Sequence, residues 1–224
     1  MQAVFSKPPG RAFKDLYLGR LILIRHCETE SNAEGTVQGR QNTHLSPRGV
    51  LQAELVGDHL GSHFPSDRVV SSDRTRCLET ISGIGVEPDT TPLLRELDFG
   101  KWEGRKWSDV ASRYPKDIEK LLNSDPSFSP PGGDSLESLN ERIQQAISEF
   151  DLLSSTKTTV VVSHDGTLRA MIAQLLGWNL QNMGNLSLFV GGISVISTQT
   201  ETPKLELLNY YDHLSSSYAA SSVI

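Results

Sequence analysis

Two short apolar runs in this chain each lead, after one further residue, to a histidine. Residues 21–24 read Leu-Ile-Leu-Ile and lead through an arginine to His26, and residues 159–162 read Thr-Val-Val-Val and lead through a serine to His164. Short apolar runs that are bounded by polar residues are typical of buried strands in a parallel sheet. The pattern therefore predicts two buried strands, each with a histidine at its carboxyl end.

The segments around these runs alternate between helical and strand patterns. Ser46 and Pro47 suit the start of a helix that ends near Gly61, and Asp134 with Glu137 predicts a capping box before another helix. Further helices are expected over 73–81 and 168–177, and further strands over 69–72, 193–197 and 204–208. This alternation predicts an α/β fold in three layers, α/β/α, with a central, mostly parallel sheet flanked by helices.

Ligands of an open α/β sheet bind beyond the carboxyl ends of its strands, so we expect His26, His164 and the segment 71–76 at one edge of the molecule. Arg25 directly precedes His26, and an unpaired charge is costly in a core, so this pair of residues indicates an anion site. Either histidine taken alone is more often structural or exposed.

Two arginines in the segment 71–80, Arg74 and Arg76, offer guanidinium groups to the same anion, because arginine binds phosphate oxygens through a planar set of donors. The alternative is a solvated helix face with Arg–Glu pairs, which fits Arg74 better than Arg76. The residues alone leave this choice open.

Five blocks in order resemble the histidine phosphatase superfamily, which has the phosphoglycerate mutase-like fold. The blocks are Arg25–Asn32, Ser71–Thr80, Leu94–Gly104, Pro131–Ser135 and Ser163–Ala170. The chain departs from the family pattern at two places beside the histidines, since Cys27 and Asp165 stand where glycine is usual. The proline-rich fourth block resembles the phosphatase branch.

The resemblance implies a phosphatase in which His26 attacks a small phosphate monoester and is transiently phosphorylated. It implies that Glu96 first donates and then accepts a proton, and that Arg25, Arg76 and His164 neutralise charge on the phosphoryl oxygens. It implies no metal and no cofactor. The positions that it assigns to substrate contact are Asn32, Gln38, Gly39, Asp165 and Gly166.

Other interpretations of the same residues remain. Glu96 read out of context could form a surface ion pair with Arg95, and Phe99 and Trp102 are expected to pack under that loop. A cofactor-dependent phosphoglycerate mutase is disfavoured because residues 120–131 contain no arginine.

Two further alternatives concern the function as a whole. A catalytically weak regulatory or scaffold member of the superfamily is disfavoured by retention of the five catalytic positions. A metal hydrolase that uses His26, His164 and Glu96 as ligands is disfavoured because their spacing matches no compact metal motif.

Composition limits the partners of the protein. The net charge is −6 with no basic tract, which argues against nucleic-acid binding, and no apolar run approaches the roughly 20 residues of a membrane span. Two cysteines, Cys27 and Cys77, without a secretory signal favour the cytoplasm over an organelle targeted by the first 20 residues. We expect an N-terminal extension over 1–20, one domain over 21–214 and a loose tail over 215–224. The expected partner is a small phosphorylated metabolite, and a homodimer is left open.

Overall fold

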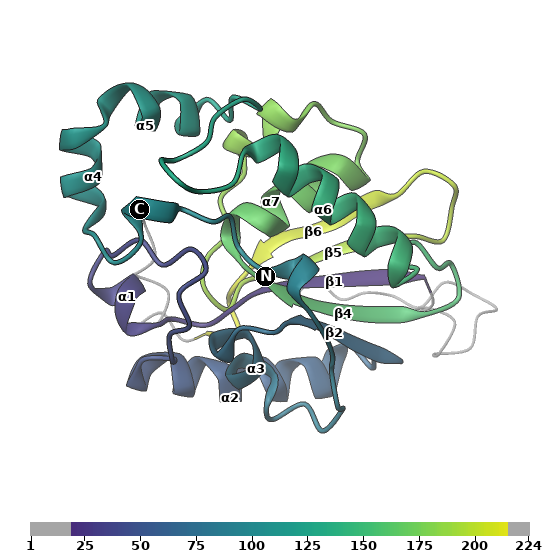
Figure 1. The fold of residues 1–224 in the computed structure, drawn as a ribbon. Helices are drawn as coiled ribbons and strands as arrows, with labels where there is room; N and C mark the ends of the chain where they lie inside the picture. The colour runs from purple at the N-terminus through teal and green to yellow at the C-terminus, as the bar shows by residue number, and fades with distance from the viewer. Residues whose placement is uncertain (1–18, 215–224) are drawn as a thin grey trace.

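The computed structural model describes residues 19–214, so the expected tail and all but the last two residues of the expected extension lie outside the described residues. A six-stranded sheet in the order β3-β2-β4-β1-β5-β6 forms its centre (Figure 1). The strands are β1 (Arg20–Arg25), β2 (Arg68–Ser72), β3 (Asp89–Thr91), β4 (Thr158–Ser163), β5 (Ile193–Ser197) and β6 (Lys204–Tyr210). Neighbours from β3 to β1 are parallel, whereas β5 is antiparallel to β1 and to β6. The predicted, mostly parallel sheet is confirmed.

The two apolar runs form adjacent parallel strands at the centre of this sheet. Arg25 at the end of β1 pairs with Ser163 at the end of β4, so His26 and His164 leave the sheet at the same level. The His26 backbone N–H donates to the Ser163 carbonyl at 2.9 Å, which extends the ladder by one bond. The expected placement of both histidines at one edge is therefore confirmed.

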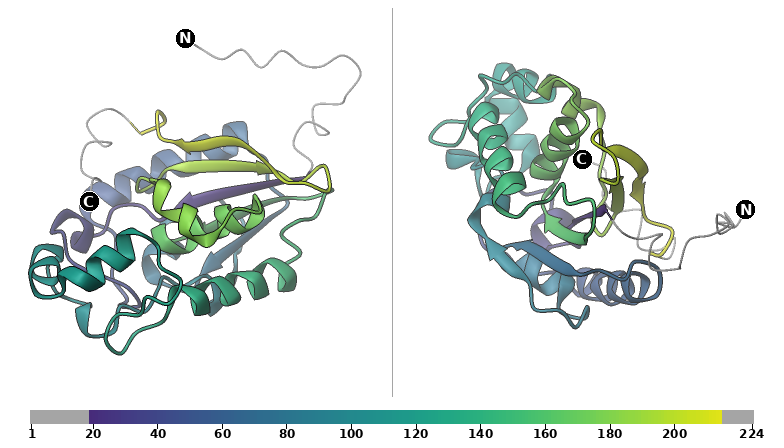
Figure 2. Two further views of the ribbon diagram at one scale, coloured as in Figure 1. Left: turned by 90° about the horizontal axis from the view of Figure 1, so that it is seen from above. Right: turned by 90° about the vertical axis from the view of Figure 1, so that its right-hand side faces the viewer.

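Helices cover both faces of the sheet, as Figures 1 and 2 show. The helices α6 (Leu136–Glu149) and α7 (Asp165–Leu175) lie on one face, and α2 (Pro47–His63) and α3 (Thr75–Ile81) on the other. Alternate side chains of β1 face opposite layers, because successive residues of a strand point to opposite sides. Leu23 belongs to the cluster under α6 and α7, and Ile24 belongs to the cluster over α2 and α3.

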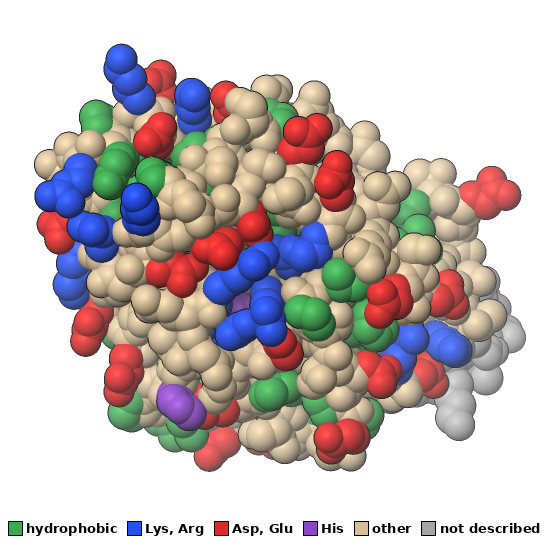
Figure 3. Space-filling model, viewed as in Figure 1, with side chains coloured by type: hydrophobic (Ala, Val, Ile, Leu, Met, Phe, Trp, Pro, Cys, Tyr) green, Lys and Arg blue, Asp and Glu red, His purple; other side chains and the backbone are tan. Residues whose placement is uncertain are grey.

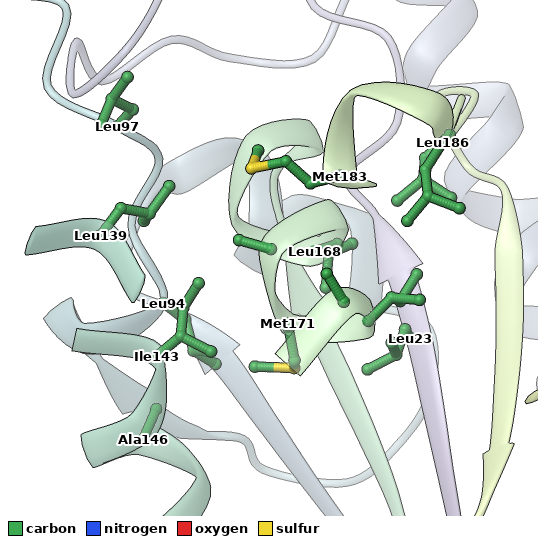
Figure 4. Close-up of a cluster of buried hydrophobic side chains, with 14 of the residues drawn as sticks. Leu23, Leu94, Leu97, Leu139, Ile143, Ala146, Leu168, Met171, Met183 and Leu186 are labelled. Atoms are coloured by element: carbon green, nitrogen blue, oxygen red, sulfur yellow. The ribbon is translucent and has the colours of Figure 1, made fainter. Parts of the chain in front are cut away.

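The core under α6 and α7 fixes the start of α7, which carries the second histidine. Leu168 and Met171 of α7 lie between Ile143 of α6 and Leu23 of β1 (Figure 4), and all four side chains are buried. Burying a side chain of this size contributes about 2 kcal/mol to stability. This packing gives α7 a fixed position relative to β1.

Shorter elements lie beyond one end of the sheet, outside the two helical layers (Figure 1). They include α1 (Glu30–Ala33), α4 (Trp107–Arg113) and α5 (Pro115–Leu122), and the chain also forms the 3-10 turns η2 (Pro92–Leu94), η3 (Gly100–Trp102) and η4 (Leu180–Asn185). Trp102 is fully buried between Tyr114 and Phe128, which confirms that it packs under its loop. None of the helices in residues 19–214 has the length and apolar composition that crossing a bilayer requires.

Of the two predicted helix caps, the one at Ser46 is confirmed and the one at Asp134 is wrong. Ser46 caps α2 by accepting from the Gly49 N–H at 3.0 Å, as expected, and α2 continues two residues past Gly61. The capping box at Asp134 is wrong, because Ser135 caps α6. The Asp134 carboxylate instead accepts a charge-assisted hydrogen bond at 2.5 Å from Arg40, a distant partner that no local pattern predicts.

Candidate active site

The ring of His26 is held in one tautomer by its neighbour. Its Nδ1 lies 2.7 Å from the Cys27 carbonyl oxygen, and a carbonyl can only accept, so Nδ1 carries the proton. The other nitrogen, Nε2, then carries a lone pair. His26 is buried, with 4% of its surface exposed, and its backbone is fixed by the strand ladder. A neutral, oriented imidazole with a free lone pair is suited to nucleophilic attack.

Burial and positive neighbours keep this histidine neutral. Desolvation lowers the pKa of His26 well below its ordinary range, and the Arg76 and Arg25 guanidinium groups lower it further. The hydrogen bond to Cys27 acts in the opposite direction and is the smallest of the four effects. His26 therefore stays unprotonated at neutral pH, where a histidine in water is partly charged.

His164 is the second neutral histidine of the site. The Arg76 Nε–H donates to its Nδ1 at 3.2 Å, so Nδ1 accepts, and its Nε2–H donates to the Ser72 hydroxyl at 2.9 Å. Burial lowers the pKa of His164 well below its usual value, with Arg76 and His26 adding to the effect. The His26 and His164 rings meet edge to face, with centroids 5.3 Å apart.

Arg76 supplies a buried positive charge that contacts His164 and lowers the pKa of His26. It is 1% exposed, and its Nη1 and Nη2 donate to the backbone carbonyls of Gln41 and Gly39 at 2.7 and 2.8 Å. These contacts fix the guanidinium and hold the loop 39–41 at the same time. Neither acceptor is charged, so the positive charge of Arg76 is not neutralised by a hydrogen-bonded carboxylate. The assignment of Arg76 to the phosphate site stays a prediction.

Arg25 lies at the end of β1, directly before His26. Its Nη1 donates to the Leu188 carbonyl at 2.6 Å and lies 3.5 Å from the Asp165 carboxylate. Its Nε is buried and has no hydrogen-bond partner in the described part of the chain. A buried donor without an acceptor is costly, and an anionic oxygen would satisfy it. This atom is therefore a candidate phosphate donor.

The Glu96 side chain lies against the amino terminus of α7, the helix that begins directly after His164. One carboxylate oxygen accepts from the Gly166 N–H at 3.0 Å, and the other accepts from the Thr167 and Leu97 N–H groups at 3.2 and 2.9 Å. The side chain is thus buried at the edge that carries both histidines. Gly166 is required for this approach, because a Cβ at that position would lie 2.7 Å from the carboxylate.

The alternative in which Glu96 pairs with Arg95 is wrong. The Arg95 Nε donates to both oxygens of Asp73, at 2.7 and 3.1 Å. The Arg95 side chain therefore pairs with Asp73 and points away from Glu96. Successive side chains of this extended segment point to opposite sides, which the dipeptide alone does not reveal.

The positions expected to contact substrate divide into two groups. Gly39 and Asp165 are linked to the site through Arg76 and Arg25, and Gly39 has a left-handed backbone (φ 51°) and lies against Glu103, where a Cβ would clash. The side chains of Asn32 and Gln38 instead make local hydrogen bonds, as the cap of α1 and to Thr43. Their contact with substrate stays a prediction, as do the roles of all ten site residues.

One residue of the site was missed in the sequence. Arg142 in α6 donates to the carbonyls of Leu93, Arg95 and Glu96 at 2.6, 2.7 and 3.2 Å, and so holds the segment that carries the Glu96 side chain. Burial lowers the pKa of Arg142 to about 10. Because its acceptors are backbone atoms, no sequence motif marks this contact.

The two cysteines pack as small buried side chains. Both are free thiols, and burial raises the pKa of Cys27 and of Cys77 to about 12. A protonated, buried thiol reacts poorly with oxidants. Within residues 19–214, no group of three or more His, Cys, Asp or Glu side chains is arranged to hold a metal ion.

The lowered pKa values predict a pH-dependent stability. A histidine whose pKa is lower in the folded state stabilises the fold fully above its unfolded pKa of about 6.5, and that stability is lost as the pH falls below it. Burial holds the pKa of His26 and of His164 well below its ordinary value, and it lowers the pKa of His213 to about 4. For each of these three histidines the loss of stability is about 1.4 kcal/mol per pH unit. We expect the free energy of unfolding in urea to drop by about 4 kcal/mol between pH 7.5 and 5.5.

His213 provides the control for that measurement, because it lies outside the site and hydrogen bonds only the Gly191 carbonyl. A His213→Asn variant should lose about a third of the pH dependence. Equal unfolding free energies at the two pH values would show that these histidines are not held neutral.

Comparison with known proteins places this geometry in a family. Residues 21–211 match the histidine phosphatase superfamily (branch 1). Phosphoserine phosphatase 1 of Hydrogenobacter thermophilus is 32% identical over 203 residues, covering 89% of this chain and 96% of the relative. The adenosylcobalamin/alpha-ribazole phosphatase of Salmonella typhimurium is 30% identical, covering 85% and 96%.

A solved structure agrees with these relatives. The crystal structure of phosphoserine phosphatase from Entamoeba histolytica in complex with 3-phosphoglyceric acid superimposes with a TM-score of 0.77 at 27% identity, covering 87% of this chain and 98% of that one. The class is therefore that of phosphoglycerate mutase-like α/β/α enzymes. The chain belongs to the histidine phosphatase superfamily, and it is a phosphoric monoester hydrolase.

Proposed function

We propose that this enzyme hydrolyses small phosphate monoesters through a phosphohistidine on His26, without a metal ion. The observation that carries the proposal is the hydrogen bond from His26 Nδ1 to the Cys27 carbonyl. This bond leaves the lone pair on Nε2, with the Arg25 and Arg76 charges acting on the ring. It also turns Nε2 away from the backbone carbonyl. The cytosolic location and the state of assembly stay predictions.

In the first step, His26 Nε2 forms a bond to phosphorus as the bond from phosphorus to the ester oxygen breaks. Glu96, protonated in the productive complex, gives its proton to the departing alcohol. The carboxyl group is positioned by the backbone N–H groups at the start of α7, which hold it near His164. The alcohol leaves neutral, and the phosphoryl group stays on the enzyme.

In the second step, water attacks the phosphohistidine. The Glu96 carboxylate takes a proton from that water as the new oxygen–phosphorus bond forms and the nitrogen–phosphorus bond breaks. Inorganic phosphate leaves, His26 is again neutral, and Glu96 is again protonated. One group thus acts as acid and then as base, which balances the protons over the cycle.

The arginines stabilise the negative charge on the phosphoryl oxygens in both steps. Phosphoryl transfer depends mainly on positioning and on stabilising charge on the three phosphoryl oxygens. The unpartnered Nε of Arg25 and the buried cation of Arg76 meet that need. His164 can donate to the phosphoryl group only if its Nε2–H leaves the Ser72 hydroxyl, because its Nδ1 accepts from Arg76.

The acid role of Glu96 predicts a dependence on the leaving group. Glu96→Gln should slow kcat/KM for an alkyl phosphate by about 10²–10³ and for p-nitrophenyl phosphate by less than about tenfold, because nitrophenolate leaves without a proton. The measurement is kcat/KM across a series of esters of graded alcohol pKa. An equal loss across the series would reject Glu96 as the acid.

Glu103→Gln is the matched control. Glu103 is half-buried and, like Glu96, accepts backbone N–H groups, from Arg40 and Phe99 at 2.7 and 3.2 Å, but it lies against Gly39 and not at the start of α7. Its replacement should change all esters of the series to the same degree.

A further inference from the structure

The arginines around the site are paired with aspartates. Arg25 lies 3.5 Å from Asp165, and Arg169 donates to the other oxygen of that carboxylate at 3.1 Å. Arg40 donates to Asp134 at 2.5 Å and lies 3.5 Å from Asp98. These six residues, Arg25, Arg40, Arg169, Asp98, Asp134 and Asp165, are called the rim below.

The rim is more exposed than the centre of the site, which comprises His26, His164 and Arg76. Its side chains are 17–33% exposed, whereas His26, His164 and Arg76 are 4% exposed or less. The chain also connects rim and centre, since Arg40 lies between the two residues whose carbonyls bind Arg76, and Asp165 follows His164. On this face, a histidine is visible among Lys and Arg side chains, with Asp and Glu side chains beside them (Figure 3).

The rim and the centre differ in what they offer to an anion. Arg76 hydrogen bonds only uncharged acceptors, so its charge is open to the phosphoryl group. Each arginine of the rim already faces at least one carboxylate. Further along the edge, Arg74 and Arg95 both face Asp73. A second anionic group on a substrate would therefore have to displace an aspartate from its arginine.

Given the proposed function, we propose that this site selects phosphate monoesters whose alcohol part carries no carboxylate and no second phosphate. The transferred phosphoryl group uses the buried cation, and the alcohol part meets Asp98, Asp134 and Asp165. These carboxylates accept hydrogen bonds from hydroxyl or ammonium groups, whereas they repel a carboxylate. The preferred alcohol is thus neutral and hydroxylated, or cationic.

Asp165 is the rim carboxylate that follows the second histidine directly in the chain. It faces both Arg25 and Arg169. As the first residue of α7, it is held close to His164. A carboxylate at this point offsets part of the positive charge that would otherwise extend outward from Arg25.

The test compares pairs of similar esters, of which one member carries a carboxylate. Glycerol 3-phosphate is paired with 3-phosphoglycerate, and phosphoethanolamine with phosphoserine, all four being primary alkyl phosphates. We expect kcat/KM to favour the carboxylate-free member of each pair by about tenfold or more, and the Ki against p-nitrophenyl phosphate hydrolysis to follow the same order. Equal or reversed preference would overturn the selectivity.

Two variants locate the selectivity in the rim. Asp165→Asn removes the carboxylate that faces Arg25 and Arg169, and Asp134→Asn removes one of the two carboxylates that face Arg40. Each variant should therefore shift the ratio of kcat/KM values toward the carboxylated ester by about threefold or more. Glu206→Gln removes the same charge at the far end of β1, where Glu206 contacts Arg20, and should leave the ratio as it is. Shifts of equal size in all three would assign the effect to net charge and overturn the proposal.

The same assays separate the selectivity from the proposed function. If wild-type enzyme does not hydrolyse p-nitrophenyl phosphate, the proposed function fails and the selectivity fails with it. If p-nitrophenyl phosphate is hydrolysed but the carboxylated esters bind as well as their partners, only the selectivity fails.

Discussion

Replacing His26 with alanine is expected to lower kcat/KM for p-nitrophenyl phosphate at least about ten-thousandfold, because the variant has no atom that can form the bond to phosphorus. Arg25, Arg76 and Glu96 stay in place but have no covalent intermediate to stabilise. Water would have to attack the ester directly, without the activation that the oriented Nε2 lone pair provides. The measurement is steady-state hydrolysis in the presence of EDTA.

Two controls accompany this variant. His63→Ala removes an exposed histidine at the end of α2 and should keep wild-type kcat/KM within about twofold. Wild-type enzyme should keep its rate in EDTA. Activity that EDTA abolishes and a divalent metal restores would favour the metal hydrolase instead, and hydrolysis retained by His26→Ala would reject His26 as the nucleophile.

Replacing Arg76 with lysine is expected to lower kcat/KM by about 10²–10³, although the charge is kept. The guanidinium binds Gly39, Gln41 and His164 with three different nitrogens, and one ammonium group cannot reach all three acceptors. The loss should appear mainly in kcat, because the charge on the phosphoryl oxygens has to be met in the transition state. Single-turnover kinetics on an aryl phosphate would measure it.

Arg68→Lys is the matched control for this prediction. Arg68 also donates to a backbone carbonyl, that of Phe150, but it lies at the opposite end of β2. Its replacement should lower stability without lowering kcat/KM by more than about twofold. Similar losses of kcat/KM in the two variants would mean that Arg76 acts through the fold and not through the phosphoryl group.

The strands that carry the site were predictable because their signal is local. A run of four buried apolar residues fixes β1, and its carboxyl end fixes the level of His26. The same holds for β4 and His164. The parallel pairing of these strands then follows from the alternation of strands with helices, so the edge of the molecule that carries the chemistry could be named in advance.

The support of the site was not predictable, because it depends on contacts between distant segments. The pairing of Asp134 with Arg40 spans 94 residues and replaces the expected helix cap. Arg142 binds backbone carbonyls 46 to 50 residues away, which no side-chain pattern encodes. The dipeptide Arg95-Glu96 gave two interpretations, and only the position of Asp73 decides between them.

Trapping the covalent intermediate tests the central claim most directly. Enzyme mixed with a radiolabelled phosphate ester is quenched in alkali within one turnover, digested and mapped by mass spectrometry. We predict a label that is stable in alkali, is lost in mild acid and lies on the peptide that contains His26, with no label in His26→Ala. A label that survives acid, or one that maps to a serine, a cysteine or His164, would contradict the assignment of His26 as the nucleophile.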